Sequence, residues 1–251
     1  MAITFSNALV DAAQSDYDVA NILSKNGYYS HSIYHFQQSF EKSIKALYSH
    51  YRTKYEKIDE KSIYIEVESY GHDTKKSSFD LLIMVSREQP KYLLKQIPDY
   101  VKRKPDSRIL ISRLFEIRST FVQSLEALKM ESIINSHILL KRYPKSVENN
   151  YNKFKASNSR IQPLTSKFIS QSGFSINRLS DETNTFFQLL ISSRSLYPCL
   201  AQMESITRYP LERFQYKNIS ILNSKDMHIV CKRINEMILA VINAATKIVK
   251  T

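Results

Sequence analysis

Glycine is scarce in this sequence, and its scarcity narrows the folds that the chain can adopt. Only three of the 251 residues are glycine, whereas average usage of about 7% would give about 18. Tight β-hairpin turns depend on glycine or asparagine for positive φ angles, so a fold built from many hairpins is excluded. The sequence also contains neither GxGxxG nor GxxxxGK(S/T), which excludes the common glycine-rich phosphate-binding loops.

Apolar residues repeat at helical spacing from the N-terminus, and the first predicted helix stops at Asn26 and Gly27. Gly27 can take the left-handed conformation that caps a helix. The next segment has the most regular pattern of the chain, with steps of three and four residues typical of a helix seam. Its seam residues are Tyr29, Ile33, Phe36, Phe40, Ile44, Leu47 and Tyr51. One glycine between two such helices predicts an antiparallel helical hairpin.

A less regular region follows this hairpin. Residues 56–70 alternate apolar and polar side chains with a period of two, and we expect an extended loop there because a lone strand has no partner. The pair His72–Asp73 is expected to cap a third helix that runs to about Arg87. The stretch after it is expected to be divided into short helices by Pro90, Pro98 and Pro105.

The second half of the chain is predicted to be helical as well. Its expected elements are a long helix over 108–142, a frayed helix and connector over 145–165, a helix over 181–206 kinked at Pro198, and a last helix over 224–249. The apolar face of the last helix holds Met227, Val230, Ile234, Met237, Val241, Ala245 and Ile248. The predicted fold class is therefore all-α.

The two cysteines, Cys199 and Cys231, are too few for a disulfide framework and do not form a CxxC pair. We expect reduced thiols in a cytoplasmic protein. The N-terminus lacks the basic and apolar regions of a secretory signal. The longest apolar run, residues 237–245, is far too short to span a membrane, so no membrane association is expected.

Three sequence elements, taken together, resemble the HEPN family (higher eukaryotes and prokaryotes nucleotide-binding domains). The first is an Asp-x3-Ala-x2-Leu helix that starts at Asp16 and ends in Gly-Tyr at residues 27–28. The second is the Tyr-x2-Gln-Gln-x2-Glu-Lys-x2-Lys-Ala-Leu pattern from Tyr34 to Leu47. The third is Arg-Tyr-Pro at residues 208–210, just before the last helix. His72–Asp73 is also similar to the His-Asp pair that opens the third helix in many members.

This resemblance implies an antiparallel HEPN-type helical bundle in which residues 1–85 and 181–251 pack together. Residues 86–180 are then an inserted basic helical segment. The chain has 36 Lys and Arg against 24 Asp and Glu, a net charge of +12, and residues 86–160 hold 16 of these bases and seven of these acids. Nine of the twelve net charges therefore lie in this segment, and such a charge favours a polyanionic partner.

Many HEPN proteins are metal-independent ribonucleases with an Arg-x4-6-His motif, whose arginine steadies phosphate charge while its histidine transfers protons. Arg208 would take the arginine position here, but the positions where histidine should follow hold Arg213, Phe214 and Gln215. The ribonuclease motif is absent elsewhere too, so whether the protein is an enzyme stays open. The candidates for a residual catalytic role are Arg208 and His72, and a capping role for His72 is the competing interpretation.

Asp16 lies on the apolar stripe of the first helix, where a carboxylate needs a partner. We expect it to meet a strip of polar residues on the second helix, spaced by about one turn. This polar strip consists of Gln37, Gln38, Glu41 and Lys45. Asp16, Gln38 and Lys45 are candidate contacts for nucleotide or RNA, and the alternative is a buried network that fixes the helix register.

Two more groups are candidates for RNA or nucleotide binding. Arg208 and Tyr209 either grip a phosphate or cap and pack the end of a helix. The basic residues Lys102, Arg103, Lys104 and Arg108 lie in the inserted segment. That segment also contains aromatic residues that could stack on single-stranded bases or else belong to the core; they are Tyr92, Tyr100, Phe115, Phe121, Tyr143, Tyr151 and Phe154.

The sequence thus predicts a HEPN protein that binds nucleotide or RNA with little or no catalysis. The resemblance implies action with a nucleotidyltransferase partner or in a toxin–antitoxin or defence system, and a homodimer. One alternative is a divergent ribonuclease that uses Arg208 with His72 or with a histidine from a second subunit. Another is a structural adaptor whose basic segment docks an acidic protein. The sequence predicts no cofactor and no metal site.

Overall fold

The structure is a computed structural model that describes residues 4–69, 79–96, 142–172, 177–208 and 224–250, with residues 99, 103, 105, 108, 112, 115–116, 119–120 and 122–127. These residues form helices and short connections without any strand, so the predicted all-α class is confirmed. The described helices are α1 (Phe5–Lys25), α2 (Tyr29–Tyr51), the π-helical turn η1 (Arg52–Glu56), α3 (Glu60–Ser69), α4 (Phe79–Gln96), α7 (Tyr143–Ser172), α8 (Asn177–Arg208) and α9 (Ser224–Val249).

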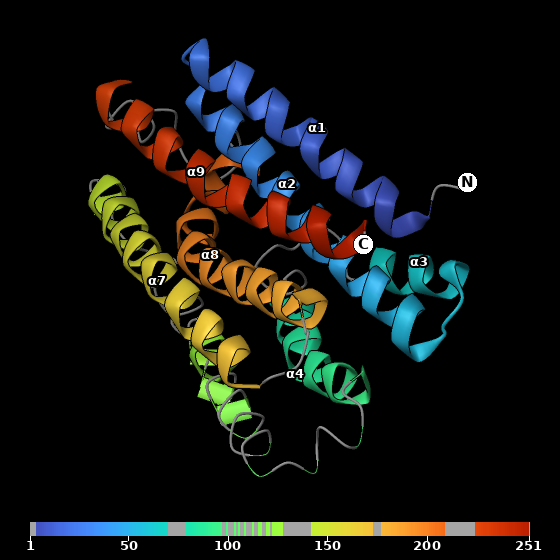
Figure 1. Ribbon diagram of the computed structural model, residues 1–251. Coiled ribbons are helices and arrows are strands. Elements are labelled where there is room, and N and C mark those ends of the chain that lie inside the picture. Colours follow the sequence, from blue (N-terminus) through green and yellow to red (C-terminus); the bar gives the residue numbers. More distant parts are fainter. Residues whose placement is uncertain are drawn as a thin grey trace.

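Helix α9 is the link between two pairs of helices (Figure 1). It packs against both α1 and α2 on one side and against both α7 and α8 on the other. Helix α2 also contacts α8 and α4, while α3 and η1 flank its C-terminal end. The first and last parts of the described chain therefore share one core.

The α1–α2 hairpin has the predicted turn. Thr4 caps α1 by accepting a hydrogen bond from the backbone N–H of Asn7. Gly27 has a φ of +80°, and the backbone N–H groups of Gly27 and Tyr28 donate to carbonyls of the last turn of α1. Two serines of α2 then fasten the helices together: Ser32 donates to the Ala20 carbonyl and Ser39 to that of Ala13.

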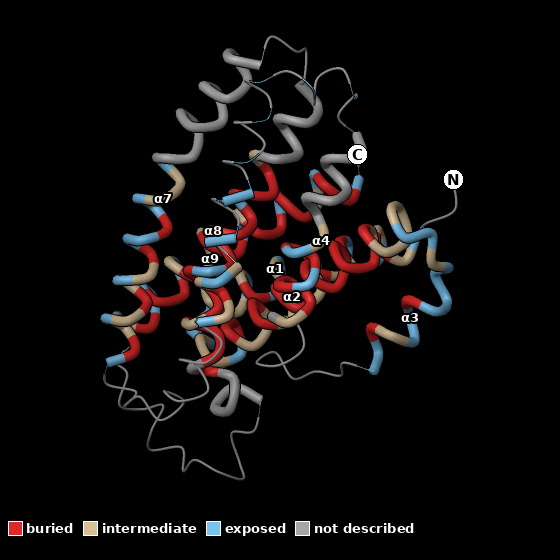
Figure 2. Tube along the Cα trace, turned by 90° about the horizontal axis from the view of Figure 1, so that it is seen from below, coloured by how far each residue is buried: buried red, intermediate tan, exposed pale blue. Residues whose placement is uncertain are grey.

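The predicted apolar faces of the second and last helices are confirmed. Apart from the half-buried Tyr29, every seam residue of α2 is at most 3% exposed, and every predicted face residue of α9 is buried. Figure 2 shows that the buried residues gather where α2, α8 and α9 pack, while α3 carries many exposed ones. Helix α8 is buried on almost all sides between Thr185 and Ala201, as expected for a helix with neighbours all round.

The extended loop predicted over residues 56–70 is wrong, because α3 is helical. Ile63 and Val67 are one turn apart and buried, whereas Ile65 is 60% exposed. The two-residue alternation thus did not separate a buried face from an exposed one. Asp59 was the sequence signal for the start of α3. Its carboxylate accepts hydrogen bonds from the backbone N–H and the hydroxyl of Ser62.

The frayed helix and connector predicted over residues 145–165 are also wrong, because α7 is continuous from Tyr143 to Ser172. Its buried side chains form one stripe at helical spacing, and this stripe packs against α8 and α9. The stripe consists of Tyr143, Val147, Tyr151 and Phe154. The polar composition hid it, since the other faces of α7 hold asparagine, serine and lysine.

Pro90 was expected to end a helix, but α4 continues through it to Gln96. The first turns of α4 bury Leu81, Leu82 and Val85, and this packing offsets the cost of about 3 kcal/mol for proline inside a helix. The predicted cap at His72–Asp73 and most of the helix predicted over 108–142 lie outside the described residues. Among the described helices, none has the length and apolar character needed to cross a membrane.

Candidate functional site

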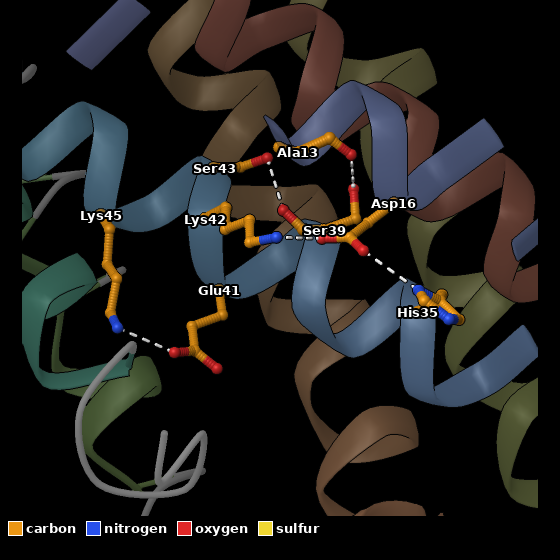
Figure 3. Close-up of polar contacts among 8 residues, drawn as sticks. All are labelled: Ala13, Asp16, His35, Ser39, Glu41, Lys42, Ser43 and Lys45. Atoms are coloured by element: carbon orange, nitrogen blue, oxygen red, sulfur yellow. Dashed lines mark hydrogen bonds and ion pairs between the residues drawn. The ribbon is translucent and has the colours of Figure 1, made fainter. Parts of the chain in front are cut away.

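Asp16 lies at the interface of α1 and α2 and contacts two side chains of α2, those of His35 and Lys42 (Figure 3). Its Oδ1 is 3.0 Å from Nδ1 of His35, and its Oδ2 is 2.5 Å from Nζ of Lys42. The side chain of Asp16 is 14% exposed, while those of His35 and Lys42 are 28% and 34% exposed. Solvent and small molecules can therefore reach His35 and Lys42 more easily than Asp16.

The expected pairing of Asp16 with the polar strip of α2 is wrong. Residues 35, 39 and 42 contact α1, whereas Glu41 and Lys45 lie one turn apart on a different face of α2 (Figure 3). Sequence reasoning missed His35 and Lys42, although a signal existed. Counting outward from the turn at Gly27 places residue 16 opposite residues 35–39 of an antiparallel partner.

Three of the four residues of the polar strip, Gln37, Glu41 and Lys45, are instead buried in the bundle. Gln37 is fully buried and donates a hydrogen bond of 2.9 Å to the Leu200 carbonyl of α8. Lys45 and Glu41 form an ion pair of 2.8 Å, with side chains only 9% and 2% exposed. Breaking a buried ion pair by removing one partner typically costs 3–5 kcal/mol. Glu41 thus neutralises the charge of Lys45 inside the protein.

The Asp16 cluster has the groups needed for proton transfer and anion contact. When Nδ1 of His35 carries the proton that Asp16 accepts, Nε2 is the basic nitrogen of the ring. The ammonium of Lys42 is one-third exposed and carries a positive charge beside it. Both oxygens of Asp16 are engaged, one by His35 and one by Lys42, so Asp16 positions these two side chains.

The other predicted site residues are distributed as follows. Gln38 is half-buried on α2, and Arg103 and Arg108 are exposed. Arg208 is the last residue of α8. The remaining candidates lie outside the described residues; they are His72, Lys102, Lys104 and Tyr209.

A second polar network, which sequence reasoning missed, joins α7 to α9. Arg233 forms two hydrogen bonds with the carboxylate of Glu148, at 2.9 and 3.3 Å. Glu236 accepts a hydrogen bond from the hydroxyl of Tyr151 and an ion pair of 3.1 Å from Lys155. The Tyr151 hydrogen bond is the main cause that holds the pKa of Glu236 below its usual value. These contacts join residues of α7 to residues about 85 positions later on α9. They therefore fix how α7 lies on α9.

The two cysteines are buried thiols. Burial raises the pKa values of Cys199 and Cys231 to about 12, so both stay protonated and poorly nucleophilic. Across the described residues, no group of three His, Cys, Asp or Glu side chains is arranged to hold a metal ion.

Comparison with known proteins gives one match. A family model for the HEPN domain matches residues 6–120. Neither the curated proteins nor the solved structures contain a match to this chain. The matched range includes all of the α1–α2 hairpin except Phe5, with both the Asp16 cluster and the polar strip.

Proposed function

We propose that this protein, whose residues 6–120 match a family model for the HEPN domain, binds single-stranded RNA without cleaving it. The observation that carries the proposal is the exposure of the basic segment. Every Lys or Arg of residues 86–160 whose side chain is described is exposed to solvent. These residues are Arg87, Arg103, Arg108, Arg142, Lys145, Lys153 and Lys155.

Several of these charges have no acidic partner among the residues that the structure describes. Arg142, Lys145 and Lys153 make no ion pair with the described part of the chain, whereas Arg87 pairs with Glu126 and Lys155 with Glu236. An exposed cation without a partner is available to a phosphate, and neutralising phosphates releases counterions from the nucleic acid. This electrostatic term is the main source of affinity in sequence-independent binding.

Among the described aromatic residues, base stacking has less support than the sequence suggested; the side chains of Tyr92, Tyr100 and Phe121 are not described. Tyr143, Tyr151 and Phe154 are at most 6% exposed and belong to the core, so the stacking role considered for them is wrong. Phe115 is the one aromatic side chain of the basic segment that is exposed in the described residues. The proposed contacts are therefore mainly to phosphates, which position RNA but carry little sequence information.

The absence of the Arg-x4-6-His motif supports binding without catalysis. Among the described histidines, His35 is held by Asp16 and burial lowers the pKa of His50 to about 4. His31 and His228 are exposed. A nucleotidyltransferase partner, a toxin–antitoxin or defence setting and a homodimeric state complete the proposal, and these rest on the family resemblance alone.

The test measures binding of a labelled single-stranded RNA at several salt concentrations. The variant Arg142→Gln/Lys145→Gln/Lys153→Gln should bind at least tenfold more weakly. A plot of the logarithm of its binding constant against the logarithm of the salt concentration should also be less steep. Each lost phosphate contact reduces the slope by about 0.7, so three lost contacts should reduce it by about two. The matched control, Lys25→Gln/Lys57→Gln/Lys61→Gln, removes three equally exposed charges from the α1–α3 region and should bind like the unmodified protein.

Two results would overturn the proposal. Equal weakening by both triple variants would show that only net charge matters and that no RNA site lies on the basic segment. Cleavage of the RNA that Arg208→Ala abolishes would establish the divergent ribonuclease instead.

A further inference from the structure

Two histidines lie one helical turn apart near the start of α2. His31 is in the first turn of the helix and is exposed to solvent, and the side chain of His35 is 28% exposed. Side chains four residues apart on an α-helix share one face, with Cβ atoms about 5–6 Å apart. Histidines with this spacing bind one metal ion between them in the HExxH helices of zinc enzymes. The spacing therefore allows both imidazoles to contact the same ion.

Asp16 orients the ring of His35. Oδ1 of Asp16 is 3.0 Å from Nδ1 of His35, and Oδ2 is 2.5 Å from Nζ of Lys42, which holds the carboxylate in place. A neutral imidazole that donates its Nδ1 proton to a carboxylate has its lone pair on Nε2. Histidines that bind metals almost always donate their other ring N–H to a carboxylate, a carbonyl or water in this way. Asp16 thus selects the tautomer of His35 that leaves Nε2 available to a metal ion.

The Nε2 atom of His35 is accessible. Figure 3 shows the second ring nitrogen of His35 on the side of the ring away from Asp16. Among the described residues, the buried polar atoms that lack a hydrogen-bond partner do not include this nitrogen. His31 meets the ring of Tyr28 edge-on, with centroids 6.4 Å apart. Because exposed side chains change rotamer rapidly, His31 can turn a ring nitrogen toward Nε2 of His35 at little cost.

The chemistry of this pair favours zinc over the hard cations. Imidazole nitrogens suit Zn²⁺, Cu²⁺ and Ni²⁺, whereas Mg²⁺ and Ca²⁺ prefer oxygen ligands. Lys42 is paired with Asp16, so the two together add no net charge that would repel a cation. Across the described residues no third His, Cys, Asp or Glu side chain is arranged with the pair. Water would therefore occupy the remaining coordination positions, as it does at open zinc sites.

We propose that His31 and His35 bind a zinc ion and that Asp16 is the positioning residue of this site. The sequence alone predicted no metal site, because the carboxylate that orients His35 is 19 positions away on another helix. The site goes beyond the proposed RNA binding, since it lies on the α1–α2 hairpin and uses none of the basic residues tested above.

Calorimetric titration of the full chain with zinc chloride tests the histidine pair. The unmodified protein should bind one zinc ion per chain, and magnesium chloride should not compete. His31→Gln and His35→Gln should each weaken zinc binding at least tenfold. The matched control, His228→Gln, removes an exposed histidine of α9 and should bind zinc like the unmodified protein. The triple variant of the basic segment should also bind zinc normally, so this test and the RNA test can fail independently.

The role of Asp16 needs a measurement that a merely structural residue would not change. In ¹⁵N NMR spectra of the imidazoles, His35 should carry its proton on Nδ1, and zinc should shift the Nε2 signal. Asp16→Asn should raise the share of the other tautomer and weaken zinc binding about tenfold to hundredfold. The unfolding midpoint of each variant checks that the chain still folds.

Three results would overturn the site. These are no zinc binding at millimolar concentration, equal effects of His31→Gln and His228→Gln, and a zinc-induced shift at Nδ1 of His35 in place of Nε2. Weaker zinc binding by Asp16→Asn with an unchanged His35 tautomer would refute the positioning role. One zinc per two chains, lost in both histidine variants of α2, would support the pair and identify a second copy of the chain as the source of further ligands.

Discussion

Helix α2 carries polar side chains on faces that a simple amphipathic helix would keep apolar. Each of these groups has a specific protein partner: Gln37 bonds to a carbonyl of α8, Glu41 pairs with Lys45, and Lys42 pairs with Asp16 of α1. Because an unpaired buried charge is far more costly than an exposed one, these contacts restrict α2 to one rotation and one register against its neighbours. A purely apolar seam would restrict both less strictly.

His50 is a residue for which burial changes the response of stability to pH. Burial and the nearby charge of Lys54 lower its pKa from 6.5 to about 4. Between these values the unfolded chain binds a proton that the native protein does not. The free energy of unfolding should therefore fall as the pH drops from about 7 to 4, by roughly 1–2 kcal/mol at pH 5.

Urea denaturation at pH 7, 6 and 5 measures this contribution. His50→Gln should flatten the decline, since glutamine does not titrate, whereas His31→Gln at an exposed position should leave it in place. An identical pH dependence of the unmodified protein and His50→Gln would contradict the assignment.

At the level of secondary-structure elements, the α1–α2 hairpin depends on the conformation of Gly27. Its φ of +80° is disfavoured for residues with a Cβ, but a Cβ added there would meet nothing within 4 Å. The cost of Gly27→Ala is therefore backbone strain alone, about 1–2 kcal/mol. Gly27→Asn should lose less, because asparagine tolerates the left-handed region better.

The denaturation midpoints of the two variants check this prediction. A shift of the midpoint reports a change in stability when the slope of the transition, the m-value, is unchanged. An alanine variant as stable as the glycine protein would show that the turn relaxes out of the left-handed region. A loss that is equal for alanine and asparagine would show that some other feature of the turn causes it.

The elements differ in how far the sequence could predict them, and the reason is the strength of their apolar pattern. Helices α2 and α9 bury long, regular stripes, so both their bounds and their faces were predictable. The described side chains of α7 include four buried ones among polar neighbours, and α3 buries two, Ile63 and Val67. A stripe that short cannot be separated from chance alternation without knowing what packs against it.

The candidate site was less predictable than the fold. That Asp16 needs a polar partner followed from its place on an apolar stripe, but the identity of the partner depended on the rotation of α2. This rotation is set by tertiary contacts such as the hydrogen bond from Gln37 to Leu200, between residues 163 positions apart.

At the scale of the whole molecule, the hydrophobic core extends beyond the residues that the family model matches. The match ends at residue 120, yet the seam of α2 is covered by α8 and α9 from the C-terminal part of the chain. The Tyr29 carbonyl, for instance, lies 3.9 Å from the thiol of Cys231 on α9. Residues 6–120 alone would therefore expose much of the apolar face of α2.

Because α9 packs against both pairs of helices, damage to its buried face should spread to both. Ile238 is fully buried on α9, and Ile238→Ala should lower the free energy of unfolding by about 2–5 kcal/mol. Hydrogen exchange should then speed up together in α1–α2 and in α7–α8, since one cooperative unit opens as a whole. Leu239→Ala, at the neighbouring position that is 37% exposed, should change neither quantity by more than about 0.5 kcal/mol. If Ile238→Ala instead accelerates exchange in α7–α8 while α1–α2 keeps its protection, the hairpin is stable without α9 and the two pairs of helices are separate cooperative units.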